Sequence, residues 1–232
     1  MDRTAIDPFP AGDDREFGYG VAKVTLGFLP GLGGPAQELL DKLVGSPLQK
    51  RREEWFAAVG LALEDLAGRV DGFDAEALAQ DEVFVSTVAR ATQLALATHG
   101  KTKREALRNI VLNTARGVRL DEALLGSFLS YVERFSEAHL KLLALLADPM
   151  ASAAYAADAK SAMMGSINGI IVKTHPDLAR DEDVLDRLHD DLARENLVNK
   201  SLKVMMSGSG LQNPQTTPYG LAFLKFIREP QD

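Results

Sequence analysis

The sequence has 232 residues, of which 46% are hydrophobic and 25% charged, so it is long enough to bury one large core or two small ones. Its net charge of −7 gives no general attraction to nucleic acid or to anionic membranes. The absence of cysteine excludes disulfide bonds, thiolate catalysis and thiolate metal sites, and it is typical of a reducing compartment such as the cytoplasm, which is the expected location.

The first 44 residues carry few strong signals. Residues 1–16 are polar, with two prolines and one glycine, and predict a flexible tail. The longest uncharged window, residues 24–37, is shorter than the about 20 apolar residues that span a membrane, and prolines and glycines interrupt it. A membrane partner is therefore not expected in the resting state. Disruption of a membrane by residues 17–44 after a trigger is an alternative hypothesis.

Most of the remaining chain has apolar residues at the three- and four-residue spacing of helices. The clearest stripe lies in residues 120–135 and consists of Leu124, Leu125, Phe128, Leu129 and Val132. The same periodicity predicts helices at residues 47–68, 81–97, 102–115, 120–135, 137–147, 163–173 and 182–195. Ser136 precedes one of them and is expected to cap it.

The segment 181–227 has the most specific order of elements. After the helix at 182–195, hydrophobicity alternates along residues 202–206, which predicts a strand with its even-numbered residues facing the core. Residues 207–214 are rich in glycine, serine, asparagine and proline and are expected to form the tip of a hairpin. Thr217 followed by Pro218 predicts the start of a closing helix.

This order, together with the sequences LARENLV and TTPYGLAFL, resembles the second half of a winged-helix domain. The predicted fold class is therefore mainly α, with an N-terminal helical bundle followed by a winged-helix-like unit that contains one small β-hairpin. The predicted domains are a flexible tail over residues 1–16, a helical domain over 17–135 and a winged-helix-like domain over 136–232.

Charge argues against duplex DNA on the helix before the wing, which enters the major groove in winged helices that bind nucleic acid. Residues 181–195 contain seven carboxylates and two arginines. Because DNA affinity comes largely from cations that neutralise phosphates, this surface repels the duplex backbone. Three of its carboxylates, Asp183, Asp186 and Asp190, are predicted to contact a protein instead.

The charge reverses in residues 101–119, where six basic residues accompany a single acidic one. They are Lys101, Lys103, Arg104, Arg108, Arg116 and Arg119. The simplest interpretation is a solvated surface. The alternative is a docking face for an acidic partner, which includes residues 181–195 of the same or a second copy. Nucleic acid is disfavoured because no aromatic side chain lies among these residues to stack on a base.

Catalytic and metal-binding motifs are weak. The best candidate for a metal site is His189 with Asp186 and Asp190, since a three-residue spacing places carboxylate and imidazole on one helical face. A solvated surface histidine is the preferred interpretation. The sequence has neither a Gly-x-Ser-x-Gly elbow nor a nucleotide-binding loop that ends in Gly-Lys-Ser/Thr. No catalytic residue, metal or cofactor is predicted, and the protein is not expected to be an enzyme.

The segment REALRNIVLNTARG, followed by LGSFLSYVERFSEAHLKLLALLADP, resembles the bacterial abortive-infection alpha family of helical domains. Four residues lie where the family's pattern places them: Phe128, Ser136, Leu140 and Leu143. Phe135 stands at a position where leucine is usual. The resemblance covers residues 80–227 and consists of packing residues, so it transfers no functional residue. It implies a helical, non-catalytic bacterial protein linked to phage defence.

Two functions follow from these observations. The first is a protein–protein interaction module in bacterial antiphage defence, which acts by self-association or on a protein partner. The alternative is a transcriptional regulator that contacts DNA through Lys200 and Lys203 of the wing or through the basic helix. Binding to random duplex DNA at low salt, where phosphate contacts are strongest, separates the two.

Overall fold

The computed structural model describes residues 46–199 and 201–230. The chain divides into two compact units, Met1–Glu54 and Trp55–Asp232, and nearly all described residues belong to the second. The expectations for residues 1–16 and 17–44 and for Lys200 lie outside the described residues.

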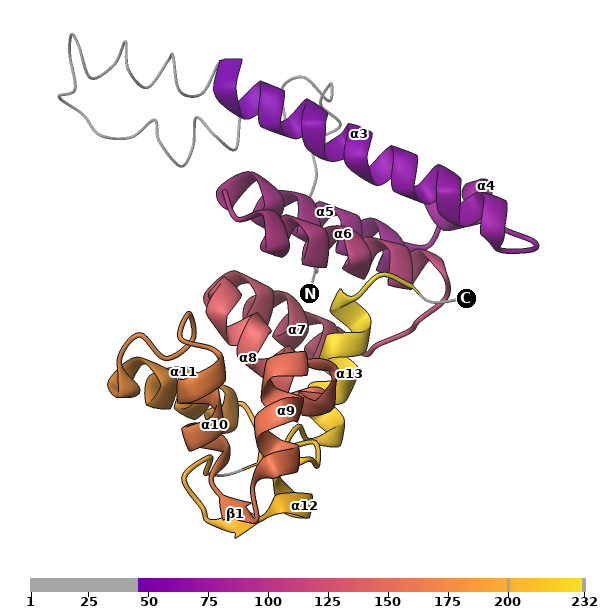
Figure 1. The fold of residues 1–232 in the computed structure, drawn as a ribbon. Helices are drawn as coiled ribbons and strands as arrows, with labels where there is room; N and C mark the ends of the chain where they lie inside the picture. Colours follow the sequence, from indigo (N-terminus) through magenta and orange to yellow (C-terminus); the bar gives the residue numbers. More distant parts are fainter. Residues whose placement is uncertain (1–45, 200, 231–232) are drawn as a thin grey trace, which may run out of the picture. The chain divides into compact units, whose positions relative to one another are not determined.

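The described part of the chain is mainly α-helical and contains one small antiparallel pair of strands, which confirms the mainly α fold predicted from the sequence (Figure 1). The winged-helix-like character of residues 136–232 stays a prediction. The elements, in chain order, are α3 (Ser46–Arg69), α4 (Ala75–Ala79), α5 (Glu82–Ala97), α6 (Lys101–Ala115), α7 (Glu122–Arg134), α8 (Glu137–Ala147), the 3₁₀-helix η1 (Pro149–Ala151), α9 (Ala153–Ser161), β1 (Met164–Gly165), α10 (Ile167–Thr174), α11 (Glu182–Arg194), β2 (Met206–Ser207), α12 (Gly208–Leu211) and α13 (Pro218–Ile227).

Side-chain caps fix where several helices begin. The predicted caps are confirmed at Ser136, whose hydroxyl accepts from the backbone of α8, and at Thr217, which caps α13 with Pro218 at its first position. The alanine-rich helix α9 was not predicted, because its small residues give no amphipathic stripe. Helix α10 begins at Ile167, later than expected, because the residues before it form β1.

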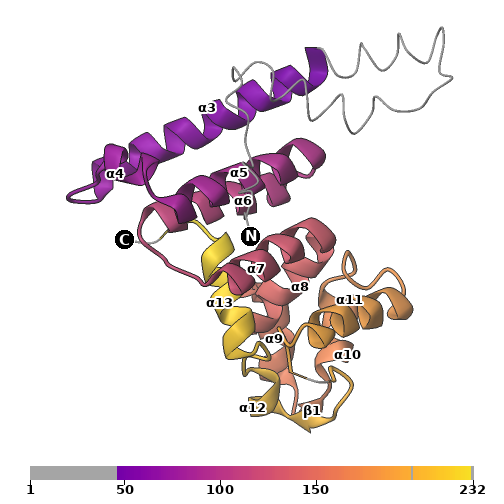
Figure 2. The ribbon, with the colours of Figure 1, turned by 180° about the vertical axis from the view of Figure 1, so that it is seen from behind.

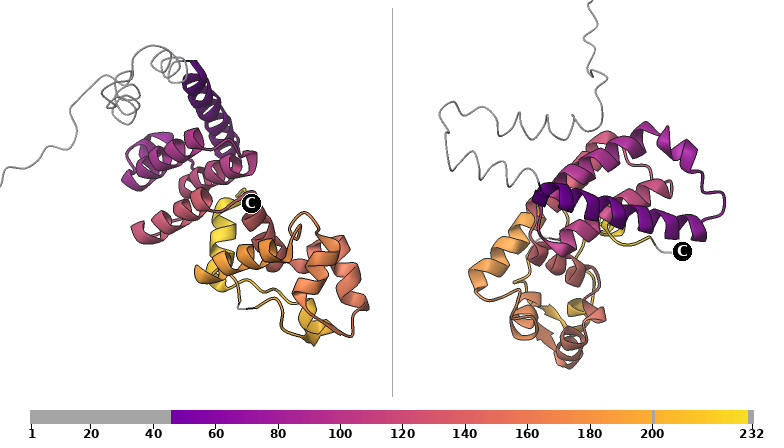
Figure 3. Two further views of the ribbon diagram at one scale, coloured as in Figure 1. Left: turned by 90° about the vertical axis from the view of Figure 1, so that its left-hand side faces the viewer. Right: turned by 90° about the horizontal axis from the view of Figure 1, so that it is seen from above.

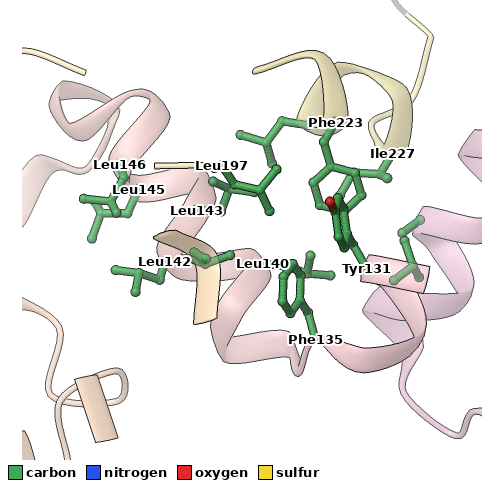
Figure 4. Packing of buried hydrophobic residues seen from close by; sticks show 14 of the residues in the cluster. Tyr131, Phe135, Leu140, Leu142, Leu143, Leu145, Leu146, Leu197, Phe223 and Ile227 are labelled. Carbon is green, nitrogen blue, oxygen red and sulfur yellow. The ribbon is translucent and has the colours of Figure 1, made fainter. Parts of the chain in front are cut away.

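One hydrophobic core runs through the second unit, and an aromatic cluster lies within it. The fully buried ring of Phe128 in α7 has four neighbouring rings with centroids 5.2 to 6.2 Å away: Tyr131, Tyr219, Phe223 and Phe226. The ring of Tyr131 in α7 lies 5.4 Å from that of Phe135 and 5.5 Å from that of Phe223 in α13, and Figure 4 shows all three residues. The predicted domain boundary near Phe135 stays a prediction, and the core is continuous across it.

Helices α5 and α6 run side by side as an antiparallel pair, which Figures 2 and 3 show from other directions. Residues 55–69 of α3 contribute to the same core, and Trp55 Nε1 donates to Thr92 Oγ1 of α5 at 2.9 Å. Helix α6 also packs against α13. Two asparagines carry that contact, since Asn109 and Asn113 of α6 donate to backbone carbonyls at the end of α13.

The strand pairing differs from the predicted hairpin. Strand β2 pairs with β1, more than 40 residues earlier, with Gly165 opposite Met206 and Met164 opposite Ser207. Residues 208–211, expected at a hairpin tip, form the short helix α12. An isolated antiparallel bridge between Val198 and Thr216 joins the two ends of the segment between α11 and α13. Of the strand predicted over residues 202–206, only Met206 belongs to β2. The expected hairpin partner is also wrong, because β2 pairs with β1.

The alternation expected along residues 202–206 is correct only in part. Leu202 is buried and Met206 half-buried, as predicted, but Val204 is 52% exposed. The reason is local, because Ser201 has a positive φ of 74° and β2 begins only at Met206, so residues 201–205 do not follow one extended strand. Val204 therefore points away from the core.

Candidate functional site

The predicted basic residues lie on or just after α6, and several are engaged within the chain. Lys103 Nζ donates to a backbone carbonyl of α7 at 2.7 Å, and Arg119 pairs with Asp81, the residue that caps α5. The guanidinium of Arg108 is half-buried and lies 3.5 Å from the side-chain oxygen of Asn109. Lys103 and Arg119 therefore support the packing between helices, which leaves a smaller basic surface than the sequence suggested.

The other three basic residues are Lys101, Arg104 and Arg116. Lys101 is exposed and forms a helical ion pair with Glu105 at 3.7 Å. Arg104 is half-buried, and Arg116, which follows α6, is exposed. Exposed pairs of this kind contribute little to stability. The role of these residues in binding a partner stays a prediction.

The predicted acidic residues lie on α11, whose leucines face the core. Leu185, Leu188 and Leu192 are buried, while Asp183 and Asp190 are exposed on the outer side. Asp186 Oδ2 accepts from Lys203 Nζ at 2.6 Å. Helix α11 thus shows the amphipathic pattern read from the sequence, with a carboxylate-rich outer face.

The acidic and basic helices have different packing partners. Helix α11 packs against α8, whereas α6 packs against α5, α7 and α13. Within one chain, therefore, the basic helix α6 does not pack against the acidic helix α11 as a main contact. Such docking between two copies stays a prediction.

A polar cluster links α8 to α11, and sequence reasoning identified only its first member. Ser136 Oγ lies 2.8 Å from His139 Nδ1, and His139 Nε2 lies 3.3 Å from Asp191 Oδ2. The same Nδ1 accepts from the backbone N–H of Ser136 at 3.1 Å, which completes a capping box at the start of α8. The Ser-x-x-His spacing was the available sequence signal. We assign the cluster to helix capping and to the α8–α11 contact.

His139 gives a pH-dependent contribution to stability. Burial lowers its pKa below the ordinary value of 6.5, the hydrogen bond to Asp191 opposes that shift, and Lys103 and Arg187 add smaller effects in the direction of burial. The folded state thus binds the proton less tightly than the unfolded state. The stabilising contribution is full above about pH 6.5 and is lost as the pH falls from there through the folded-state pKa.

We therefore expect the free energy of unfolding to fall less in the His139→Gln variant than in the wild type when the pH is lowered from about 7 to about 5. Glutamine at this position keeps a side chain that can complete the capping box, so the comparison isolates the titration. Urea denaturation at a series of pH values measures it. Parallel pH profiles for the two proteins would contradict the assignment.

The interpretation of His189 as a solvated surface residue is wrong. Its side chain is buried, and Nε2 lies 3.1 Å from the carbonyl oxygen of Asn199, while Nδ1 lies 3.7 Å from Asp190. The carbonyl partner fixes the ring against the segment that follows α11. Among residues 46–199 and 201–230, no group of three histidine, aspartate or glutamate side chains converges to hold a metal ion.

A surface feature that was not predicted lies where β1 meets β2 in the described part of the chain. Four exposed apolar residues lie in β1 or just before one of the two paired strands: Met163 (87%), Met164 (67%), Val204 (52%) and Met205 (61%). We call these four residues the methionine tip. The methionine pairs at 163–164 and 205–206 were visible in the sequence, but their pairing across more than 40 residues was not.

The backbone beneath the methionine tip is firmly held. Gly208 N donates to Met163 O at 2.9 Å, and a Cβ at Gly208 would lie 2.2 Å from the carbonyl oxygen of Ala162, so only glycine permits this approach. Leu202 O accepts from Asn168 N at 3.0 Å. Figures 1 and 2 show β1 beside α12 at the end of this arrangement.

A buried tyrosine anchors α12 behind the tip. Tyr155 of α9 is fully buried, and its hydroxyl donates to Leu211 O at 3.0 Å. Burial raises the pKa of Tyr155 to about 12, so the phenol stays protonated and donates throughout the physiological range. The tip is thus an apolar surface on a fixed support.

Comparison of the chain with protein-family models, with curated proteins and with solved structures finds no match. Among the described helices, none combines the length and apolar character needed to cross a membrane.

Proposed function

We propose that this protein is a non-catalytic protein–protein interaction module that associates with a second copy of itself through the methionine tip. The observation that carries the proposal is that four exposed apolar side chains lie in or just before two strands that pair with each other. Contiguous exposed apolar patches on soluble proteins mark contact surfaces, and methionine side chains adapt readily to a partner.

The firm support beneath the tip favours binding. The hydrogen bond from Gly208 to Met163 and the bond from Asn168 to Leu202 fix the backbone on both sides. A surface that is ordered before association loses less conformational entropy when a partner arrives. The tip therefore needs little rearrangement to dock.

Charges near the tip favour a second copy as the occupant. Lys203, beside the tip, pairs with Asp186 of α11, so the tip and the carboxylate face are neighbours in one chain. Asp183 and Asp190 are exposed on that face, and Lys160 is exposed at the end of α9, just before the tip. A two-fold interface sets residue i against j and j against i, so a patch with both signs of charge is self-complementary.

The resemblance to the abortive-infection alpha family extends the proposal to bacterial antiphage defence in the cytoplasm. A helical protein that acts by contact suits that role, and the cysteine-free sequence suits a reducing compartment. The family assignment rests on the packing residues of 80–227 and on no functional residue.

Replacement of two tip residues by lysine tests the proposal. We expect Met164→Lys with Met205→Lys to raise the dissociation constant for self-association at least about tenfold, because two charges per copy would be buried at the interface. Sedimentation equilibrium of the full chain over a concentration series measures it. The control, Leu61→Lys with Val85→Lys, alters exposed apolar residues elsewhere and is expected to leave the constant unchanged.

Three outcomes would overturn the proposal. They are a wild-type protein that stays monomeric up to its solubility limit, equal weakening by the tip and control variants, and unchanged association in a tip variant that melts like the wild type. Titration with random duplex DNA at low salt addresses the alternative function. Binding there that falls steeply with added salt would favour the transcriptional regulator.

A further inference from the structure

We propose that the methionine tip is an oxidation site, at which a peroxide converts the thioethers of Met163, Met164 and Met205 to sulfoxides and thereby weakens self-association. The oxidation itself depends only on the geometry of the tip. Its effect on self-association rests on the proposed function.

Exposure distinguishes these three methionines from the others in the described chain. Met163, Met164 and Met205 are 87%, 67% and 61% exposed, while Met150 and Met206 are only partly exposed. Susceptibility of sulfur to oxidants follows exposure. The sequence contains no cysteine, so no thiol of this protein competes for the oxidant.

The register of the strand pair accounts for the different exposure of Met206 and Met164. Gly165 lies opposite Met206 and Met164 lies opposite Ser207, so Met206 and Met164 occupy opposite faces of the pair. Met205 precedes β2 and is 61% exposed. Met206 lies against α12, where a Cβ on Gly210 would be 3.4 Å from its sulfur.

The chemistry is an oxygen-atom transfer. The thioether sulfur attacks one peroxide oxygen, the O–O bond breaks and an S–O bond forms. The second oxygen leaves as water after proton transfer. Sulfur loses two electrons and the peroxide gains them. The product is a polar sulfoxide in place of a flexible apolar group, and methionine sulfoxide reductases reverse the change.

Oxidation removes apolar character from the methionine tip, which is the proposed contact surface. Three of the four members of the methionine tip change from apolar to polar, and only Val204 is left unaltered. Because the backbone beneath the tip is held by its own hydrogen bonds, the fold does not depend on these side chains. Oxidation therefore alters the surface without unfolding the protein.

Graded treatment of the full chain with hydrogen peroxide, followed by peptide mass spectrometry, tests the site. We expect Met163, Met164 and Met205 to be oxidised several-fold faster than Met150 and Met206. Retention of the intact protein on a hydrophobic-interaction column should fall in step with that oxidation, and a methionine sulfoxide reductase should restore it. Equal oxidation rates at all five positions, or selective oxidation with unchanged retention, would overturn the proposal.

Leucine variants connect the chemistry to association. In Met163→Leu with Met164→Leu and Met205→Leu, the tip keeps its apolar character and cannot be oxidised, so self-association should survive peroxide. The control Met150→Leu should remain as sensitive as the wild type. Loss of association in both after peroxide would overturn the regulatory half of the proposal. If the wild-type protein does not associate at all, only the proposed function is refuted. The oxidation rates and the column retention still test whether the methionine tip is an oxidation site.

Discussion

Gly220→Ala is expected to destabilise the protein by about 3 kcal/mol, although alanine favours a helix more than glycine does. Gly220 lies in the first turn of α13, and a Cβ there would stand 2.1 Å from Leu197 O and 2.7 Å from Thr216 Cγ2. The backbone must shift to admit it. That shift breaks the hydrogen bond from Thr217 N to Leu197 O, which joins α13 to the segment after α11.

Thermal unfolding measures this effect, and a loss of about 3 kcal/mol corresponds to a fall of about 6 to 12 °C in Tm for a chain of this size. Gly60→Ala is the matched control. Gly60 lies in the middle of α3, where an added Cβ meets nothing within 4 Å, so the same substitution should stabilise the protein by about 1 kcal/mol. Changes of the same sign in the two variants would refute the argument from close approach.

Asn113→Ala is expected to cost about 3 kcal/mol by leaving backbone carbonyls at the end of α13 unpaired, among them that of the buried Phe226. The last carbonyls of a helix have no partner within it, and Asn113 Nδ2 lies 2.9 Å from both Phe226 O and Arg228 O at the end of α13. The side chain is 6% exposed, so water does not replace it freely. Asn113→Asp should lose at least as much, because a carboxylate cannot donate to these carbonyls.

Urea denaturation measures the free energy of unfolding of both variants, and the slope of the transition shows whether the compactness of either state has changed. Asn213→Ala, at an exposed position before α13, serves as the control and should change stability by less than about 0.5 kcal/mol. If Asn113→Ala matched that control, the side chain would not be needed to hold α13 against α6.

The helices and their caps were largely predictable because their causes are local. The leucines of α11 recur every three or four residues, Ser136 accepts from the first turn of α8, and Thr217 with Pro218 begins α13. Asn196 ends α11 in the left-handed conformation, with the hydrogen bond from Leu197 N to Leu192 O that such an end requires. Each signal lies within about one helical turn of its effect.

The candidate site was less predictable because it depends on pairs distant in sequence. Charge counting identified the cations of α6, but only the structure shows that Lys103 donates to a carbonyl of α7 and that Arg119 pairs with Asp81. His189 was taken for a surface residue because its sequence neighbours are acidic, yet the segment after α11 folds over it. Net charge along a helix does not reveal which side chains the fold engages.

The sequence by itself determined a mainly helical fold, the positions of most helices and an acidic outer face on α11, because periodicity and capping are properties of adjacent residues. Only the tertiary structure decided that β2 pairs with β1, that Gly220 must remain glycine and that Met163, Met164 and Met205 lie exposed beside this strand pair. Those outcomes depend on which distant segments meet, and a strand of two residues carries too little pattern to select its partner.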